Sequence, residues 1–249
     1  MINLGCGGVD TASIGSEALR QQSAGQLEED LVELFVSSRS FDAASPLAQK
    51  LYRDHPSEAR PAYLIGVILR EKGVYEEAER FFLEALSKDH AHSDAYDALG
   101  ILYGIRGQID QALKAHKKAT DLKPKIAKYW HNYGFALCLA QKFKEAIKAF
   151  QRSLSLAPEQ ERTFVSLAFA FGALGDYQEM RRYLSQVLTT AQVEFNLGVV
   201  REKRGEREVA LAHYRRALSL HQNFELARES IGRLERELTP STNRLPKTH

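Results

Sequence analysis

Small and apolar residues return along this chain with a period of 34 residues. The clearest markers are Gly66, Gly100 and Gly134, and Ala168 continues the series at the same spacing. An aromatic residue or alanine stands four residues before each marker, an aliphatic residue or tyrosine stands one before, and an apolar residue or tyrosine stands three after. A fixed period of this length indicates a stack of similar units, each of which buries its apolar face against its neighbours.

Each unit is expected to contain two helices, a first and a second, joined by a short turn. A glycine or alanine at the eighth position and an alanine at the twentieth let the two helices approach closely. Glycines expected in the turn, where a positive φ favours glycine, are Gly73, Gly107 and Gly175. A proline at the thirty-second position ends several second helices. No strand-like alternation of useful length occurs, so the sequence predicts an all-α fold.

The period divides the chain into six units and a closing helix. The predicted units are residues 25–58, 59–92, 93–126, 127–160, 161–190 and 191–224, followed by a capping helix over 225–238. The fifth unit is short, because Leu197-Gly198 follows the preceding marker by only 30 residues, and about one helical turn is missing. Residues 1–24 and 239–249 are rich in Gly, Ser, Thr and Pro and are expected to be mobile.

The third and fourth units carry a recognisable residue order. It runs Tyr96, Leu99-Gly100, Tyr103, Gly107, Ala112, His116, Ala119 and Pro124 in the third, and Trp130, Tyr133-Gly134, Leu137, Ala146, Phe150, Ser153 and Pro158 in the fourth. This order resembles the tetratricopeptide repeat (TPR), with its W-x2-L-G-x2-Y, A-x3-F, A and P positions. The resemblance implies a right-handed superhelical solenoid whose first helices line a concave surface, and a non-enzymatic scaffold for protein–protein interaction.

Composition narrows the partner class. The net charge is only +2, so nucleic acid is not expected as a partner. The stretch from Lys114 to Arg152 nevertheless holds ten Lys and Arg residues against Asp121 and Glu145. A solvated helix face is the favoured interpretation of that excess, and a phosphate or anionic-lipid patch is the alternative. Cys6 and Cys138 are too few for a disulfide framework, and no apolar run is long enough to span a membrane.

Sequence motifs for catalysis and metal binding are absent. Phosphate-binding loops of the G-x-x-x-x-G-K-[ST] type, G-x-S-x-G nucleophile turns and H-E-x-x-H zinc helices do not occur. The nearest metal-like spacing, His90-x-His92, has no cysteine beside it, and His116 takes the repeat's aromatic position. We therefore expect no enzyme activity, no cofactor and no metal site.

The resemblance to TPR proteins implies that the second, fifth, ninth, twelfth and thirteenth residues of each first helix face the concave surface. The predicted partner-binding residues at these positions are Tyr63, Val67, Ile101, Ile105, His131, Phe135, Leu139, Val165, Phe169, Phe195 and Val199. Such an apolar stripe suits an amphipathic helix or an extended apolar segment of another protein. The alternative is self-burial, either by adjacent helices or by a terminal segment. The Lys and Asn carboxylate clamp of chaperone-tail binders is absent from these positions, so a heat-shock co-chaperone is disfavoured.

Two segments resemble bacterial pilus-assembly lipoproteins. Residues 131–150, HNYGFALCLAQKFKEAIKAF, are similar to the repeat of type IV pilus pilotins, and residues 167–198 are similar to a late repeat of Flp-pilus assembly lipoproteins. The resemblance implies an outer-membrane secretin or pilus component as the partner. Cys6 lies in a Leu4-Gly5-Cys6-Gly7 sequence typical of a lipidation site, but the apolar stretch of an export signal does not precede it. Lipidation predicts the periplasmic face of the outer membrane. The alternative is a cytoplasmic TPR adaptor or a co-chaperone-like module without a carboxylate clamp.

Overall fold

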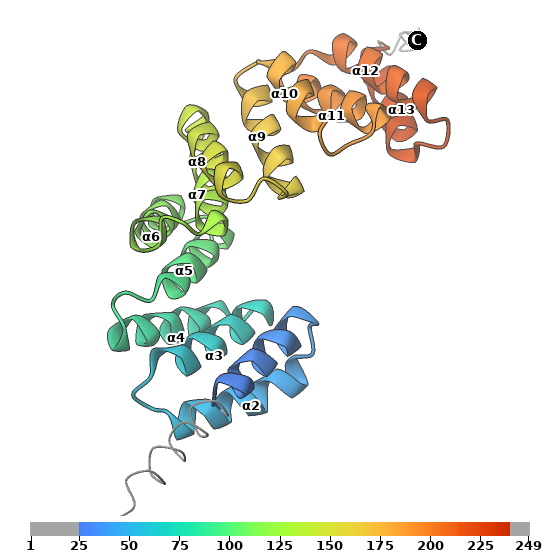
Figure 1. The fold of residues 1–249 in the computed structure, drawn as a ribbon. Helices are drawn as coiled ribbons and strands as arrows, with labels where there is room; N and C mark the ends of the chain where they lie inside the picture. The colour runs from blue at the N-terminus through green and yellow to red at the C-terminus, as the bar shows by residue number, and fades with distance from the viewer. Residues whose placement is uncertain (1–24, 240–249) are drawn as a thin grey trace, which may run out of the picture. The chain divides into compact units, whose positions relative to one another are not determined.

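The computed structural model describes residues 25–239, and this part of the chain contains helices and turns without a strand (Figure 1). The all-α prediction is therefore confirmed for the described residues. The helices, in chain order, are residues 25–37, α2 (Phe41–Asp54), α3 (Ala59–Glu71), α4 (Tyr75–Lys88), α5 (Ser93–Ile105), α6 (Ile109–Leu122), α7 (Ala127–Leu139), α8 (Phe143–Leu156), α9 (Glu161–Ala173), α10 (Tyr177–Leu184), α11 (Thr190–Lys203), α12 (Arg207–Leu220) and α13 (Glu225–Leu238). Cys6 lies outside the described residues.

The described residues divide into two compact units, with the boundary between Leu122 and Lys123. In the first unit, α3 packs on α4 and α5 packs on α6, and α4 contacts α5. In the second unit, the pairs α7–α8, α9–α10 and α11–α12 pack in the same way, and α13 closes the series against α12. The first helices of successive pairs also meet, because α3 contacts α5, and α9 contacts both α7 and α11. Each unit therefore presents a surface made of adjacent first helices.

The period-34 glycines lie where the helices of a pair come closest. A Cβ atom added at Gly66, Gly100 or Gly134 would lie 2.6–2.7 Å from a ring atom of the second helix. The rings belong to Phe82, His116 and Phe150, and Tyr214 stands in the same relation to Gly198. The alanines at the twentieth position, Ala78, Ala112, Ala146 and Ala210, are buried. The 34-residue spacing therefore reflects a steric requirement. A larger side chain at the eighth or the twentieth position would separate the two helices of the pair.

The fifth pair meets this requirement with different residues. Its marker position is Ala168 rather than glycine, and its twentieth position is the buried Met180 rather than alanine. Gly172, one turn after Ala168, makes room for Met180, because a Cβ at Gly172 would lie 2.6 Å from the Met180 sulfur. α10 has only eight residues, whereas the other second helices have fourteen. A capping box formed by Thr189 and Gln192 then begins α11 directly.

Each turn within a helix pair contains one residue with a left-handed backbone conformation. Gly107 adopts φ 72°, and the backbone N–H of Gln108 donates to the carbonyl of Tyr103 at 2.8 Å, which closes the end of α5. Gln141 occupies the matching place after α7 with φ 58°, although it carries a side chain. This turn therefore stores a strain that glycine would relieve. Within the described residues, no helix combines the length and apolar character needed to cross a lipid bilayer.

Candidate functional site

The fifth-position residues of the first helices pack inward on the ring of their own second helix. The Tyr63 ring lies 6.1 Å from the Phe82 ring, the His131 ring 5.6 Å from the Phe150 ring, and the Phe195 ring 5.3 Å from the Tyr214 ring. In each case the partner follows 19 residues later in the chain. These three side chains therefore pack within their own helix pairs, as the self-burial alternative for the stripe expects of them.

In the third repeat, formed by α5 and α6, polar side chains make the equivalent contact. Asp97 and His116 are both buried, and the Asp97 carboxylate lies 2.8 Å from His116 Nδ1. His116 also fills the aromatic position against Gly100. Because the imidazole is packed on one face and held by a carboxylate at its edge, it serves the helix pair as a structural residue.

In the first compact unit, which ends at Leu122, the exposed apolar part of the predicted stripe lies at the end of α5. The Tyr63 ring is covered by the His92 ring at 5.0 Å and by the Arg60 guanidinium at 5.6 Å, and burial raises the pKa of its hydroxyl. Val67 and Ile101 are half-buried, whereas Ile105 is 53% exposed. Ile105 is thus the predicted residue of this unit that most clearly reaches solvent.

In the second unit, His131 connects α7 to α9. Its Nδ1 atom lies 2.9 Å from the Thr163 hydroxyl, which is itself 3.2 Å from the side-chain carbonyl of Gln160. The His131 side chain is buried, so it is not available as a surface contact for a partner. It instead fixes the register between two neighbouring first helices.

Phe195 is half-buried and packs against two aromatic rings. Its ring lies 5.0 Å from the ring of Phe224, the residue that immediately precedes α13, and Val199 packs in the same cluster. His92 covers Tyr63 from the equivalent position, the last residue before the next first helix. Sequence reasoning missed both contacts, although an aromatic residue or histidine at the final position of the period was a visible signal.

The exposed part of the stripe in the second unit is carried by α7. Phe135 is 54% exposed and Leu139, one turn later, is 44% exposed. Val165 and Phe169 on α9 are half-buried and also pack on Ala168, Met180 and Leu184. Phe135, Phe169 and Val199 hold the same repeat position on three first helices that contact one another in order. We call Phe135, Leu139, Val165, Phe169 and Val199 the α7–α11 strip.

Cys138 lies between the two exposed residues of the strip but is itself half-buried. Burial raises the pKa of its thiol to about 11, so the thiol is protonated at neutral pH. A protonated thiol is a weak nucleophile and a poor metal ligand. Cys138 therefore adds apolar surface to α7 and supplies no reactive group.

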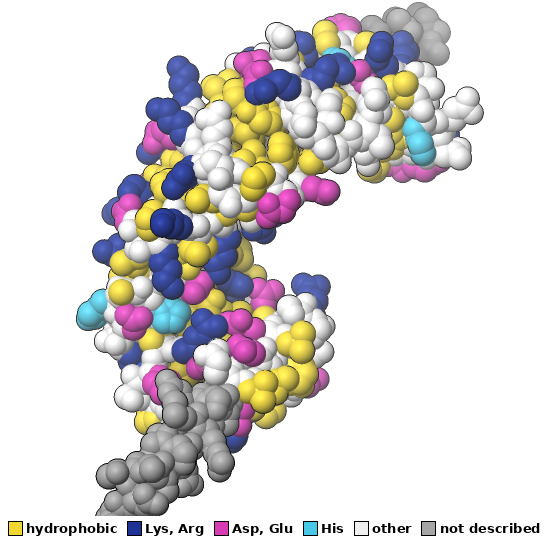
Figure 2. Space-filling model, in the orientation of Figure 1, with side chains coloured by type: hydrophobic (Ala, Val, Ile, Leu, Met, Phe, Trp, Pro, Cys, Tyr) yellow, Lys and Arg dark blue, Asp and Glu magenta, His cyan; other side chains and the backbone are white. Residues whose placement is uncertain are grey.

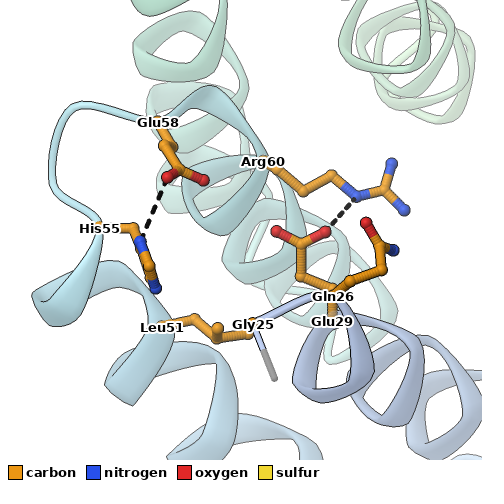
Figure 3. Close-up of a pocket in the computed structure, with 7 residues that line it drawn as sticks. All are labelled: Gly25, Gln26, Glu29, Leu51, His55, Glu58 and Arg60. Carbon is orange, nitrogen blue, oxygen red and sulfur yellow. Dashed lines mark ion pairs between the residues drawn. The ribbon is translucent and has the colours of Figure 1, made fainter. Parts of the chain in front are cut away.

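A pocket of about 740 Å³ lies where the helix over residues 25–37 begins (Figure 3). Its lining residues are Gly25, Gln26, Glu29, Leu51, His55, Glu58 and Arg60. Glu58 lies 3.2 Å from His55, and Glu29 lies 3.6 Å from Arg60. Burial raises the pKa of Glu29 against the opposing effect of Arg60. Each charged side chain of the lining is therefore paired with another lining residue. The charges of the pocket give no reason to expect a particular ligand there.

A buried carboxylate holds the short fifth pair to the sixth. Glu194 on α11 is 1% exposed and lies 2.8 Å from Arg181, 2.8 Å from His213 Nδ1 and 3.1 Å from Arg216. Burial alone would raise the pKa of Glu194, but the hydrogen bonds from Arg181 and His213 outweigh it and lower the pKa. The cluster joins α10, α11 and α12 at the place where α10 ends early. We assign it to structure.

One histidine of the candidate metal pair caps a helix. His92 Nδ1 accepts a hydrogen bond from the backbone N–H of Ala95 at 3.2 Å, at the start of α5, and burial lowers the pKa of His92. His90 is exposed on the preceding turn. Within residues 25–239, no group of three or more His, Cys, Asp or Glu side chains is placed to hold a metal ion.

Family comparisons identify the repeat. Models of the tetratricopeptide repeat match residues 29–96, 93–126, 127–160 and 195–241, which together cover more than half of the chain. Among curated proteins, the protein O-mannosyl-transferase TMTC1 of Homo sapiens is 22% identical over 223 residues. The match covers 88% of this chain and only 22% of that protein.

Solved structures share the fold. A structure from the functional characterisation of Pseudomonas aeruginosa PilF superposes with a TM-score of 0.67 at 16% identity, covering 87% of this chain and 98% of that one. YrrB, a TPR protein described as having an unusual peptide-binding site, superposes with a TM-score of 0.55 at 19% identity, covering 74% of this chain and 96% of YrrB. Since the repeat models match four segments and the helices pack in consecutive pairs, this chain belongs to the tetratricopeptide-repeat family.

Proposed function

We propose that this protein is a non-enzymatic interaction scaffold that binds an apolar or amphipathic segment of another protein along the α7–α11 strip. The observation that carries the proposal is the exposure of Phe135 and Leu139, at 54% and 44%, on a first helix whose packing does not require them. Gly134, the preceding residue, already makes the contact with Phe150 that closes the α7–α8 pair. Phe135 and Leu139 lie on another side of the same helix and add nothing to that contact.

The strip has the composition of a helix-binding surface. Phe135 and Leu139 are one turn apart, so their side chains lie next to each other on α7. A partner helix with apolar residues at positions i, i+3 or i+4, and i+7 presents a matching row. Each aromatic anchor that is desolvated in such an interface can contribute about 2 kcal/mol or more to the free energy of binding.

The neighbouring contacts hold the strip rigid before a partner arrives. The His131–Thr163 hydrogen bond of 2.9 Å fixes α7 against α9. Phe169 and Val165 pack against the buried cluster that contains Met180. A surface that is already ordered loses little conformational entropy on binding, which favours affinity. The peptide-binding site described for YrrB favours a peptide as the ligand of this protein too.

In the first unit, we include Val67, Ile101 and Ile105 in the proposed partner surface. They hold the same repeat positions as the strip residues, and Ile105 is 53% exposed. Tyr63, His131 and Phe195 remain in the proposal only as supporting residues, since their rings are packed on the second helices.

A peptide selection tests the scaffold proposal. The full chain, immobilised through its C-terminus, is used to select binders from a library of random 16-residue peptides. We expect enriched peptides to share apolar residues at helical spacing. Replacing Phe135 by a photo-reactive phenylalanine should cross-link the selected peptide, whereas the same replacement at Gln151, exposed on α8, should not. Equal cross-linking from both positions contradicts the proposed surface.

We extend the proposal to a narrower role, a pilotin-like lipoprotein that assembles an outer-membrane secretin or pilus. Its support is the similarity of residues 131–150 to pilotin repeats and the Leu4-Gly5-Cys6-Gly7 sequence. The likeness to PilF, at 16% identity, supports the shared fold alone. The competing role is a cytoplasmic TPR adaptor.

Metabolic labelling of the gene product with a radioactive fatty acid separates the two roles. The lipoprotein role predicts label on the wild-type protein and its loss, with release from membranes, in Cys6→Ser. Cys138→Ser is the matched control and should keep the label. An unlabelled, soluble wild-type protein would reject the lipoprotein role and leave the adaptor.

A further inference from the structure

The solvent face of α8 carries a row of basic side chains. Lys144, Lys148 and Arg152 follow one another at four-residue spacing, and all three are exposed. This spacing places them on one side of the helix, over about 12 Å of its length. Lys142, immediately before α8, is exposed as well. We call these four residues the α8 basic row, and Figure 2 shows Lys and Arg side chains gathered over this helix.

Several other cations of this unit have an acidic partner, whereas the residues of the α8 basic row do not. Arg182 pairs with Glu179, Arg215 with Glu235 and Arg233 with Glu202. In the described part of the chain, none of the four residues of the row forms an ion pair, and the contact recorded for Arg152 is 3.4 Å to the Ser155 hydroxyl. The positive charge of α8 is therefore not neutralised within the protein.

Helix stability does not account for this arrangement. Like charges four residues apart repel each other along a helix. Lys144 also lies in the first turn, where the helix dipole favours a negative side chain. The residues at the same repeat position in α2, α4, α6 and α12 are acidic: Asp42, Glu76, Asp110 and Glu208. In α8 the charge at this position is reversed, and folding gains nothing from the reversal.

The chemistry of the face selects one kind of partner. Its exposed residues are the α8 basic row together with Glu145, Gln151 and Ser155. This set has no aromatic side chain on which nucleic-acid bases could stack, and no apolar anchor of the kind found at the centre of protein interfaces. Long, flexible lysine side chains instead suit a mobile array of phosphate groups.

We propose that the outer face of α8 docks on the anionic phospholipid headgroups of a membrane surface through Lys142, Lys144, Lys148 and Arg152. The attraction is electrostatic and needs no insertion of apolar side chains. The inference is independent of the α7–α11 strip, because it rests on different residues of a different helix.

Vesicle co-sedimentation of the full chain tests the inference. The probes are vesicles of phosphatidylcholine with 40% phosphatidylglycerol, and vesicles of phosphatidylcholine alone. We expect the wild-type protein to bind the anionic vesicles at 50 mM salt, not to bind the neutral ones, and to dissociate at 1 M salt. A basic residue at an anionic surface contributes about fivefold to the partition constant. The triple variant Lys144→Gln, Lys148→Gln, Arg152→Gln should therefore bind about 100-fold more weakly.

The matched control removes three cations that already have partners. Lys50, Arg182 and Arg228 pair with Glu28, Glu179 and Glu225, so their triple replacement by Gln causes the same change in net charge. This control should bind within about threefold of wild type, and both triple variants should keep the wild-type circular dichroism spectrum. Equal losses in the two triple variants would assign binding to net charge and overturn the inference. Absence of wild-type binding, or tighter binding to an oligonucleotide or a polyglutamate peptide than to the vesicles, would overturn it too.

Discussion

Replacing Gly134 by alanine should destabilise the protein, although alanine is the better helix former. Gly134 lies in α7, and an added Cβ would lie 2.7 Å from one Phe150 ring atom and 2.8 Å from another. Carbon atoms in ordinary contact are about 3.5–4.0 Å apart, so the ring or the helix must move by roughly 1 Å. Phe150 is 0% exposed and has buried neighbours, so the ring has no free space to enter.

The size of the effect follows from two opposing contributions. Overpacking of a core contact costs about 1–3 kcal/mol, and the full burial of Phe150 places this case toward the upper end. The exchange of glycine for alanine within a helix contributes about 1 kcal/mol in the favourable direction. The free energy of unfolding should therefore fall by about 1–2 kcal/mol.

Gly232 in α13 provides the matched control. It also lies within a helix of the second unit, but a Cβ there would meet nothing within 4 Å. Gly232→Ala should thus raise the free energy of unfolding by up to about 1 kcal/mol. Urea denaturation followed by circular dichroism at 222 nm measures both. If Gly134→Ala stabilised the protein as much as Gly232→Ala, the close approach of α7 and α8 would be refuted.

Two further predictions concern the turns and the buried carboxylate. Gln141→Gly should raise the free energy of unfolding by up to about 1 kcal/mol, because Gln141 adopts φ 58°, whereas Gly107→Ala should lower it by about 1 kcal/mol; urea midpoints that move in the opposite directions contradict the turn assignment. The lowered pKa of Glu194 means that its stabilising effect is complete above the unfolded-state pKa of about 4.3 and is lost as the pH falls through the folded-state value. Glu194→Gln should therefore be less stable at pH 7 and should lose less stability between pH 6 and pH 3 than wild type, measured as urea midpoints across that range. Glu145→Gln, at an exposed site, serves as the control, and an unchanged acid dependence in Glu194→Gln would contradict the role of the buried cluster.

The helix pairs could be predicted from the sequence because their contacts leave little choice of residue. Only a missing side chain at Gly66, Gly100 or Gly134 allows the ring from the second helix to pack at that distance, so the period is visible in the residues themselves. The fifth pair obeys the same steric rule with Ala168, Met180 and Gly172. The repeat pattern alone does not predict this substitution of residues, because it depends on which side chains contact one another in the folded pair.

The partner surface was harder to predict because position in a repeat does not fix burial. Phe135, Phe169 and Val199 share the ninth position, but Phe135 is exposed whereas the other two are half-buried. Phe195 is covered by Phe224, which lies outside the positions that define the repeat. The exposure of Phe135 and Leu139, by contrast, accords with the repeat positions from which a partner surface was inferred. Their role in binding stays a prediction.

The central claim is that exposed residues of α7 bind a partner segment while buried residues of α8 hold the fold. The decisive measurement is the affinity of a selected apolar peptide, by fluorescence anisotropy, together with the free energy of unfolding for the same variants. Phe135→Ala with Leu139→Ala should weaken binding at least 30-fold, since a truncated anchor costs about 2 kcal/mol or more, and should change the free energy of unfolding by less than about 1 kcal/mol.

Phe150→Ala provides the opposite pattern. Because Phe150 is fully buried, its truncation should lower the free energy of unfolding by about 3–5 kcal/mol, while the fraction that remains folded should bind the peptide with wild-type affinity. If Phe135→Ala with Leu139→Ala lost as much stability as Phe150→Ala and its folded fraction kept full affinity, the exposed residues would belong to the core and the scaffold assignment to α7 would be wrong.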